Sequence, residues 1–101
     1  MTPQEQESII TLALIASFAD GSKDDHEHAA LVAQTLSDKF SDNDIRQATN
    51  MVFVDLDSET YRGLATHLRN HDIQVDRPRW VMHLDVSRSD VDQIISAIRS
   101  F

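Results

Sequence analysis

The segment from Arg77 to Arg88 constrains the fold most, because it contains a strand, a helix cap and the start of a helix in direct succession. Every second side chain in its first half is apolar, which is the period-two pattern of a half-buried strand: Trp80, Met82 and Leu84. Ser87 and Asp90 have the spacing of a capping box, in which a hydroxyl and a carboxylate bind free amides at a helix start. The residues that follow are apolar on one helical face: Val91, Ile94, Ile95, Ile98 and Phe101.

The same order of strand, cap and helix occurs once before. An apolar run from Asn50 to Leu56 precedes Asp57 and Ser58, which are candidate caps for a helix over 59–70. This helix carries four residues on its expected buried face: Tyr61, Leu64, Ala65 and Leu68. The second half of the chain therefore predicts two strand-to-helix units.

These units predict an α/β protein of the two-layer α+β kind, with two N-terminal helices before a β-α-β-β-α unit. The strands 50–56, 73–76 and 79–85 form a three-stranded, mainly antiparallel sheet, and helices 59–70 and 88–100 cover one face. The first strand is apolar on both of its sides, so the second face of the sheet also needs a cover. The first two helices or a partner subunit would provide it.

The N-terminal part predicts the two further helices. The first starts at Thr2 and reaches Ala19, with nine apolar residues among the eleven from Ile9 to Ala19. A helix that is apolar on more than one side must be buried, in the core or against a second copy. Gly21 would end it, and a second helix would run from 22 to 39. One further helical turn is expected at 45–48.

Composition limits the classes of function. The 101 residues form a single domain, and their net charge is −8, of which −6 lies in residues 1–50. An acidic surface without a basic stripe argues against nucleic-acid binding. There is no cysteine, and the longest apolar run is about half of the roughly 20 residues that span a membrane. We therefore expect a cytoplasmic protein without membrane contact.

Two stretches of the second half carry a family resemblance, namely residues 50–55 (NMVFVD) and 79–87 (RWVMHLDVS). With the helix from residue 24 onward, residues 24–101 resemble the C-terminal small domain of low-specificity L-threonine aldolases, pyridoxal-phosphate enzymes of the aspartate-aminotransferase fold type. Met82 and residues 40–48 depart from the family pattern. The resemblance implies that Arg79 binds the substrate carboxylate as a bidentate fork. Without a large domain it has no pocket to face, and the alternative, which we favour, is a solvated arginine at a strand end near Asp76 or Asp85.

The same resemblance implies a cofactor held by a Schiff-base lysine, which in this family belongs to a large domain. Lys23 and Lys39 are the only lysines of the chain, and neither lies in a matching motif. We therefore expect that the chain alone binds no cofactor and no small-molecule substrate and is not an enzyme.

Residues 8–36 carry a second resemblance, through Ala19-Asp20-Gly21 and the acidic run behind it, to the helical TerB-type tellurite-resistance domain. Oxygen ligands in this loop suit a divalent cation: Asp20, Asp24 and Glu27. The run lacks the full spacing of a calcium loop, and carboxylates at a helix start also stabilise the helix dipole. Segments that resemble two unrelated folds indicate a chimera, recombined or designed de novo, or a gene fragment with a new start.

The histidines are weak metal candidates. His67 and His71 are four residues apart and share a helical face, whereas His26 and His28 do not. A pair without a third ligand does not define a zinc site.

Three hypotheses for function follow. The first is a non-catalytic, aldolase-like domain that acts only through self-association, as a homodimer formed by the first helix or by the uncovered sheet face. The second is a TerB-like module that binds a divalent cation. The third is part of a pyridoxal-phosphate threonine aldolase that needs a separate large domain.

Overall fold

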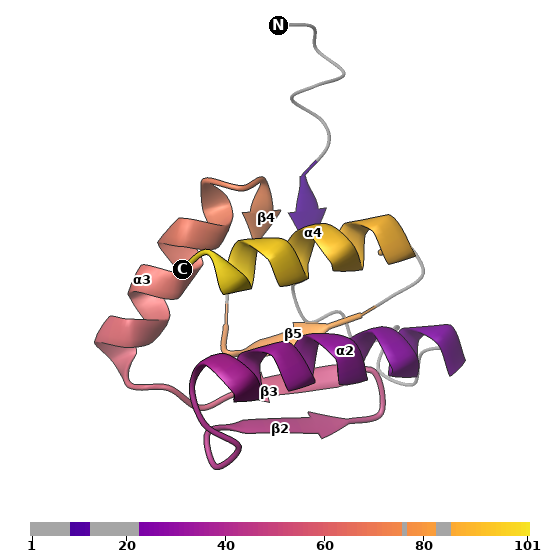
Figure 1. Ribbon diagram of the computed structural model, residues 1–101, viewed down its shortest axis with the longest axis horizontal. Helices are drawn as coiled ribbons and strands as arrows, with labels where there is room; N and C mark the ends of the chain where they lie inside the picture. Colours follow the sequence, from indigo (N-terminus) through magenta and orange to yellow (C-terminus); the bar gives the residue numbers. More distant parts are fainter. Residues whose placement is uncertain (1–8, 13–22, 76, 83–85) are drawn as a thin grey trace, which may run out of the picture.

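The computed structural model describes residues 9–12, 23–75, 77–82 and 86–101 (Figure 1). Its elements, in chain order, are β1 (Ile10–Thr11), α2 (Lys23–Lys39), β2 (Ile45–Ala48), β3 (Met51–Val54), α3 (Ser58–Arg69), β4 (Ile73–Gln74), β5 (Arg79–Val81) and α4 (Arg88–Arg99). The predicted α+β class with a three-stranded antiparallel sheet is confirmed. The helices predicted at 22–39, 59–70 and 88–100 are confirmed to within one residue at each end.

The three-stranded sheet has the order β2-β3-β5, and both of its pairings are antiparallel. Val52 lies opposite Trp80, and Phe53 lies opposite both Arg46 and Arg79. Because side chains alternate along a strand, Val52 and Trp80 share one face while Phe53 and the two arginines share the other. The sheet therefore buries Val52 and Trp80 on one face and carries two positive charges on the other.

Two predictions about the strands of the sheet are corrected by the structure. Residues 45–48, expected as a helical turn, form β2, because pairing with β3 places Ile45 opposite Val54 and buries both. Thr49 adopts a φ of 53°, which lets the chain reverse tightly between the two strands. The predicted strand at 73–76 is observed as β4, but it does not belong to the three-stranded sheet.

The first predicted helix is also wrong where the structure describes it, because residues 10–11 form β1. This strand pairs in parallel with β4, and the amides of Ile10 and Leu12 donate to Asp72 O (2.9 Å) and Gln74 O (3.0 Å). Val81 N donates to Leu12 O (3.3 Å), so the residue that follows β1 also contacts β5. These long-range bonds outweigh the local helical pattern. The rest of that helix, at 2–8 and 13–19, and the stop at Gly21 lie outside the described residues.

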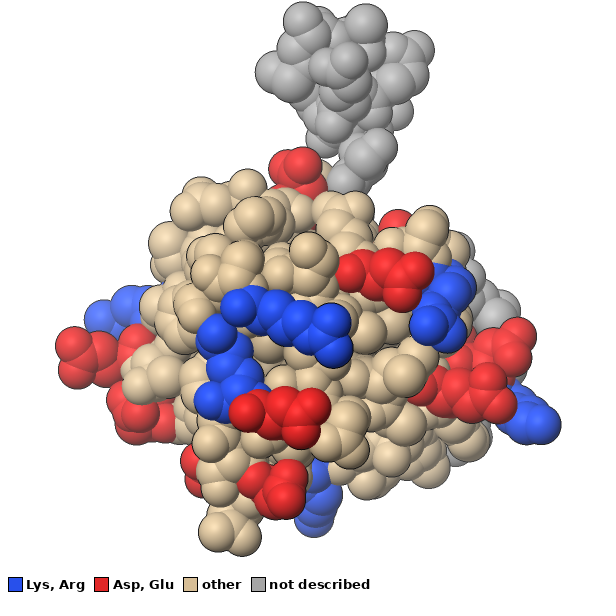
Figure 2. All heavy atoms as spheres, in the orientation of Figure 1, with Lys and Arg blue, Asp and Glu red and all other residues tan. Residues whose placement is uncertain are grey.

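Helices α2 and α4 lie side by side over the same side of the sheet (Figure 1). Helix α2 packs on α4, β2 and β3, while α3 packs on α4 and β4 at the margin. The prediction that α3 and α4 share one face is therefore corrected, since α2 takes the place expected for α3. The core under these helices contains the largest fully buried side chains, among them Trp80, Leu36, Leu64, Leu68, Ile94 and Ile98. Acidic and basic side chains are interspersed on the outer surface of α2 and α4 (Figure 2).

Both predicted caps are confirmed. Ser87 and Asp90 form a complete capping box, in which Ser87 Oγ accepts from Asp90 N (3.1 Å) and Ser87 N donates to Asp90 Oδ2 (3.0 Å). At the start of α3, the hydroxyl of Thr60 donates to Asp57 Oδ1 (2.6 Å) and its amide donates to Asp57 Oδ2 (3.0 Å). These two bonds, the hydroxyl bond first, hold the pKa of Asp57 below its ordinary value of 3.8.

The depressed pKa of Asp57 predicts a pH-dependent contribution to stability. The contribution is present above the unfolded-state pKa near 3.8 and is lost as the pH falls through the lowered folded-state pKa. Asparagine also caps helices but does not titrate in this range. In urea denaturation, wild type should therefore be more stable than Asp57→Asn at pH 6, and this difference should shrink below pH 3.8. A difference that stays constant down to pH 2.5 would contradict the assignment.

Candidate functional site

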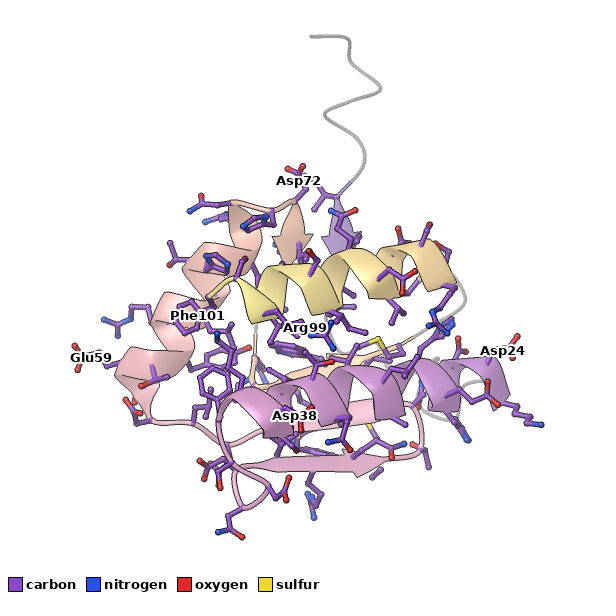
Figure 3. All side chains as sticks on the ribbon, viewed as in Figure 1. Asp24, Asp38, Glu59, Asp72, Arg99 and Phe101 are labelled. Atoms are coloured by element: carbon purple, nitrogen blue, oxygen red, sulfur yellow. The ribbon has the colours of Figure 1, made fainter. Side chains whose placement is uncertain are left out.

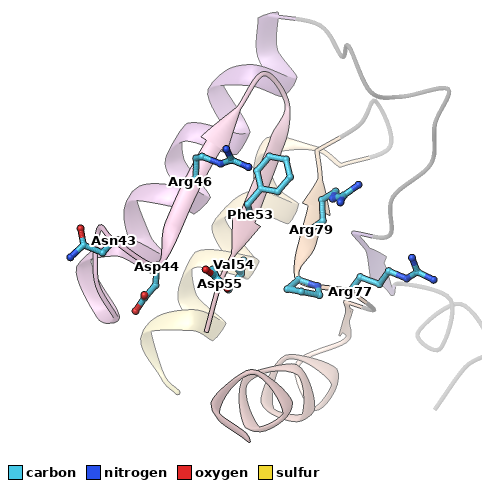
Figure 4. Close-up of a pocket in the computed structure, with 9 residues that line it drawn as sticks. Asn43, Asp44, Arg46, Phe53, Val54, Asp55, Arg77 and Arg79 are labelled. Atoms are coloured by element: carbon cyan, nitrogen blue, oxygen red, sulfur yellow. The ribbon is translucent and has the colours of Figure 1, made fainter. Parts of the chain in front are cut away.

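A hollow of about 460 Å³ lies on the sheet face opposite α2 and α4 (Figure 4). Its lining comes from the ends of β2, β3 and β5 and from the loops beside them: Asn43, Asp44, Arg46, Phe53, Val54, Asp55, Arg77, Pro78 and Arg79. We call the side of the sheet that bears Arg46, Met51, Phe53 and Arg79 the outer face. Part of the outer face is not exposed to solvent, because Val81 belongs to this face by strand alternation and is fully buried.

Phe53 lies in the middle of the outer face with an arginine on each neighbouring strand (Figure 4). The Cζ atom of Arg46 is 4.5 Å from the Phe53 ring centroid, and that of Arg79 is 5.6 Å away. Both distances are within the range of cation–π attraction, which favours guanidinium groups over aromatic rings. The half-buried ring of Phe53 therefore holds two positive charges close together on one surface.

A chain of hydrogen bonds positions the segment that carries Arg79. The indole Nε1 of the buried Trp80 donates to the hydroxyl of Tyr61 on α3 (2.9 Å), and this hydroxyl donates to Arg77 O (2.8 Å). On the other side, Val54 N donates to Pro78 O (2.9 Å). Residues 77–80 are thus bound to both α3 and β3, so the place of Arg79 on the outer face depends on the core.

The guanidinium groups at the hollow are free to bind a ligand. Among the described residues, no hydrogen bond or ion pair engages the side chains of Arg46, Arg77 or Arg79. Arg88, by contrast, forms an ion pair with Asp92 on α4 (3.2 Å). A guanidinium presents five donors and no acceptor, so its natural ligand is an oxyanion. The lining holds three arginines and two aspartates, in a chain whose net charge is −8. The hollow is therefore locally basic on an acidic protein.

The residues around the hollow do not fit pyridoxal phosphate, because no lysine is part of the lining. Lys39 Nζ instead donates to Arg99 O (3.3 Å) and lies 5.9 Å from the Phe101 ring centroid. Lys23 is an exposed residue at the start of α2. Neither lysine of the chain is placed to hold a cofactor at this face.

The predicted cation site is brought together only in part. Asp20 lies outside the described residues, whereas Asp24 and Glu27 are exposed on the first turns of α2, beside a groove that also contains His28 and Arg88. Figure 3 shows Asp24 at the end of α2 that points away from the rest of the fold. Within the described ranges, no three His, Cys, Asp or Glu side chains are grouped as metal ligands. Cation binding by this loop stays a prediction.

The histidine pair is confirmed as neighbours, since the rings of His67 and His71 have centroids 4.7 Å apart. His67 Nε2, however, lies 2.9 Å from Ala97 O and 2.9 Å from Ser100 Oγ. Nε2 of His67 therefore links α3 to the end of α4. This structural contact accounts for the position of His67 without a bound metal.

Arg46 is the site residue that sequence reasoning missed. It lies in the stretch 45–48, which was assigned to a helical turn, so no alternation of faces was considered there. The available signal is the order Ile45, Arg46, then a polar turn at Thr49 directly before a strand. Read as a hairpin, this order places Arg46 beside Phe53.

Comparisons with known proteins agree with the aldolase resemblance. The "Low specificity L-threonine aldolase" of Escherichia coli O157:H7 and that of Escherichia coli strain K12 are each 32% identical to this chain over 82 residues. The match covers 78% of this chain but 24% of each relative, so the chain spans about a quarter of their length. No protein-family model matches the chain. The chain thus resembles one region of these aldolases. None of the helices in the described part of the chain has the length and apolar character needed to cross a membrane.

The bridge from Trp80 through Tyr61 to Arg77 O predicts the effect of removing one hydroxyl. Tyr61→Phe keeps the ring but leaves the buried indole N–H without this acceptor, which should lower the free energy of unfolding by about 1–2 kcal/mol. Thr66→Val on the same helix is the control, because this exposed hydroxyl should change stability by less than about 0.5 kcal/mol. Urea denaturation measures both variants. Equal stability of Tyr61→Phe and wild type would contradict the role of the bridge.

Proposed function

We propose that this chain acts as the small domain of a threonine-aldolase-like enzyme and binds a substrate carboxylate through Arg79. The observation that carries this proposal is the position of Arg79, unpaired within the described chain, in a hollow on the outer face. The aldolase similarity supports it, because the family resemblance assigns the carboxylate contact to this arginine. A planar guanidinium binds a carboxylate through two parallel hydrogen bonds.

The outer face also suits contact with a second domain. Phe53 and Met51 are half-buried apolar side chains among arginines, whereas the opposite face is already covered by α2 and α4. A large domain placed against the outer face would exclude water from Phe53 and enclose a carboxylate held by Arg79. Removing water strengthens the charge-assisted hydrogen bonds of such a site.

We further propose that this chain does not catalyse aldol cleavage by itself. Its two lysines lie away from the hollow, and a Schiff base needs a lysine beside the bound cofactor. The large domain of the relatives would have to supply that lysine and the phosphate contacts. The role of this chain in the reaction would be to bind and orient the substrate carboxylate.

Complementation tests this proposal. The chain should restore threonine cleavage to a threonine aldolase from which the region that matches this chain has been deleted, whereas the chain alone should show none. Arg79→Gln should lower kcat/KM of the restored activity by about 10²-fold, because a buried charge pair loses one partner. Arg62→Gln, on the exposed side of α3, is the matched control and should have little effect. Correct folding of both parts without any restored cleavage would refute the proposal, as would cleavage by the chain alone.

Self-association as a homodimer is a second candidate function. Ile9 is 52% exposed and belongs to the apolar run from Ile9 to Ala19, in which nine of eleven residues are apolar. Pairing of two outer faces is less favourable, since it would bring Arg46 and Arg79 of both copies together. The N-terminal segment around Ile9 is therefore the proposed contact.

Light scattering should report a dimer mass at high micromolar concentration. Ile9→Asp should lower the dimer fraction, because it places a charge in an apolar contact. Arg46→Gln should leave the dimer fraction unchanged, since the outer face is not the proposed interface. A monomer mass for wild type at this concentration would rule out the dimer.

A TerB-like cation-binding module remains the alternative proposal. It requires Asp20 together with Asp24 and Glu27, of which the last two are exposed on α2. A chimeric or designed origin rests on the same resemblance of residues 8–36, and 13–22 lie outside the described residues.

A further inference from the structure

We propose that Arg46 and Arg79 together form a binding site for one dianionic oxyanion, a dicarboxylate or a phosphate group, which this chain binds without a second domain. The site shares Arg79 with the proposed function but does not depend on it. Arg46 is its distinguishing residue. It lies on β2, which pairs with β3 beside Phe53.

The register of the sheet places the two arginines for joint binding. Arg46 and Arg79 are both opposite Phe53, on the strands to either side of it. Their Cζ atoms lie 4.5 Å and 5.6 Å from the ring centroid, which places them no more than about 10 Å apart. A charge-assisted bond to an oxyanion oxygen spans about 2.8 Å, so a ligand with several oxygens can contact both groups from above the ring edge.

Phe53 contacts the two exposed guanidinium groups without using their hydrogen-bond donors. A guanidinium that stacks on an aromatic ring uses its flat face, and the N–H donors in its plane remain free. In the described part of the chain neither arginine is engaged by a carboxylate. The ring therefore orients two donor groups without consuming their hydrogen bonds.

The charges of the hollow are separated along its length. Figure 4 shows Arg46 and Arg79 beside Phe53, whereas Asp44 and Asp55 lie toward the other end of the strands. The side chain of Arg77 points away from Phe53 in the same view. Two arginines rather than three thus define the positive end, and the two carboxylates do not lie between them.

The spacing of these charges favours a dianion over a monoanion. Two like charges within about 10 Å repel each other in the free protein, and this repulsion is relieved only when the ligand neutralises both. A monoanion such as acetate satisfies one guanidinium and leaves the other unpaired. Affinity should therefore rise with the number of negative charges on the ligand and should need both arginines.

Titration of the full chain by NMR tests this site with three probes: inorganic phosphate, succinate and acetate. At pH 8 and constant ionic strength, phosphate or succinate should cause saturable amide shifts at residues 46, 53 and 79. The affinity for acetate should be at least about tenfold lower than that for the tighter-binding dianion. Tighter binding of phosphate identifies a phosphoryl ligand, and tighter binding of succinate identifies a dicarboxylate.

Variants decide whether both arginines take part. Arg46→Gln and Arg79→Gln should each weaken dianion binding about tenfold or more, and Arg46→Lys should restore part of the affinity lost in Arg46→Gln. Arg69→Gln, exposed at the end of α3 away from this hollow, is the matched control and should bind as wild type. Unchanged binding by Arg46→Gln, or equal affinity for acetate and both dianions, would overturn the proposal. Failure of complementation with a large domain would leave these results unaffected.

Discussion

The rest of the structure depends on the burial of Trp80 and on the hydrogen bond that its indole N–H donates to Tyr61. The Trp80 side chain is fully buried between the sheet and the helices, and its indole N–H is satisfied by Tyr61, which in turn binds Arg77 O. Burial of a large aromatic ring removes about 150–250 Å² from water, which stabilises the fold by about 4–6 kcal/mol. Because Trp80 and Arg79 are adjacent in β5, burial of the first directs the second to the outer face. The core and the candidate site are therefore two sides of one strand.

The outer face shows how a small acidic protein can present a basic site. Most acidic residues belong to helices, caps and loops, whereas the sheet presents Arg46 and Arg79 around one aromatic ring. Cation–π attraction to Phe53, at distances of 4.5 Å and 5.6 Å from the ring centroid, offsets part of the repulsion between the two guanidinium groups. The result is a local positive surface. Such a surface suits small oxyanions better than nucleic acid, which needs a longer basic stripe.

The aldolase similarity and the structure both support the proposal that this chain supplies a carboxylate-binding arginine and that another domain supplies the lysine. The matched region is about a quarter of the relatives' length, and the described residues place an arginine, but no lysine, at the hollow. In the proposed function, Arg79 needs only its place on a rigid strand to bind a carboxylate. The Schiff-base lysine would come from another domain in that proposal, because no lysine lines the hollow.

The sequence by itself determined the elements with strong local signals. The capping box at Ser87 and Asp90, the cap at Asp57 and the alternation through Trp80 predicted α3, α4 and β5, because their hydrogen bonds and periodicity involve near neighbours. Only the tertiary structure decided that residues 10–11 and 45–48 are strands, since β1 needs a partner about 60 residues away in the sequence and β2 needs the turn at Thr49 that brings it beside β3. Arg79 was found from its motif, whereas Arg46 became a site residue only when pairing with β3 placed it beside Phe53.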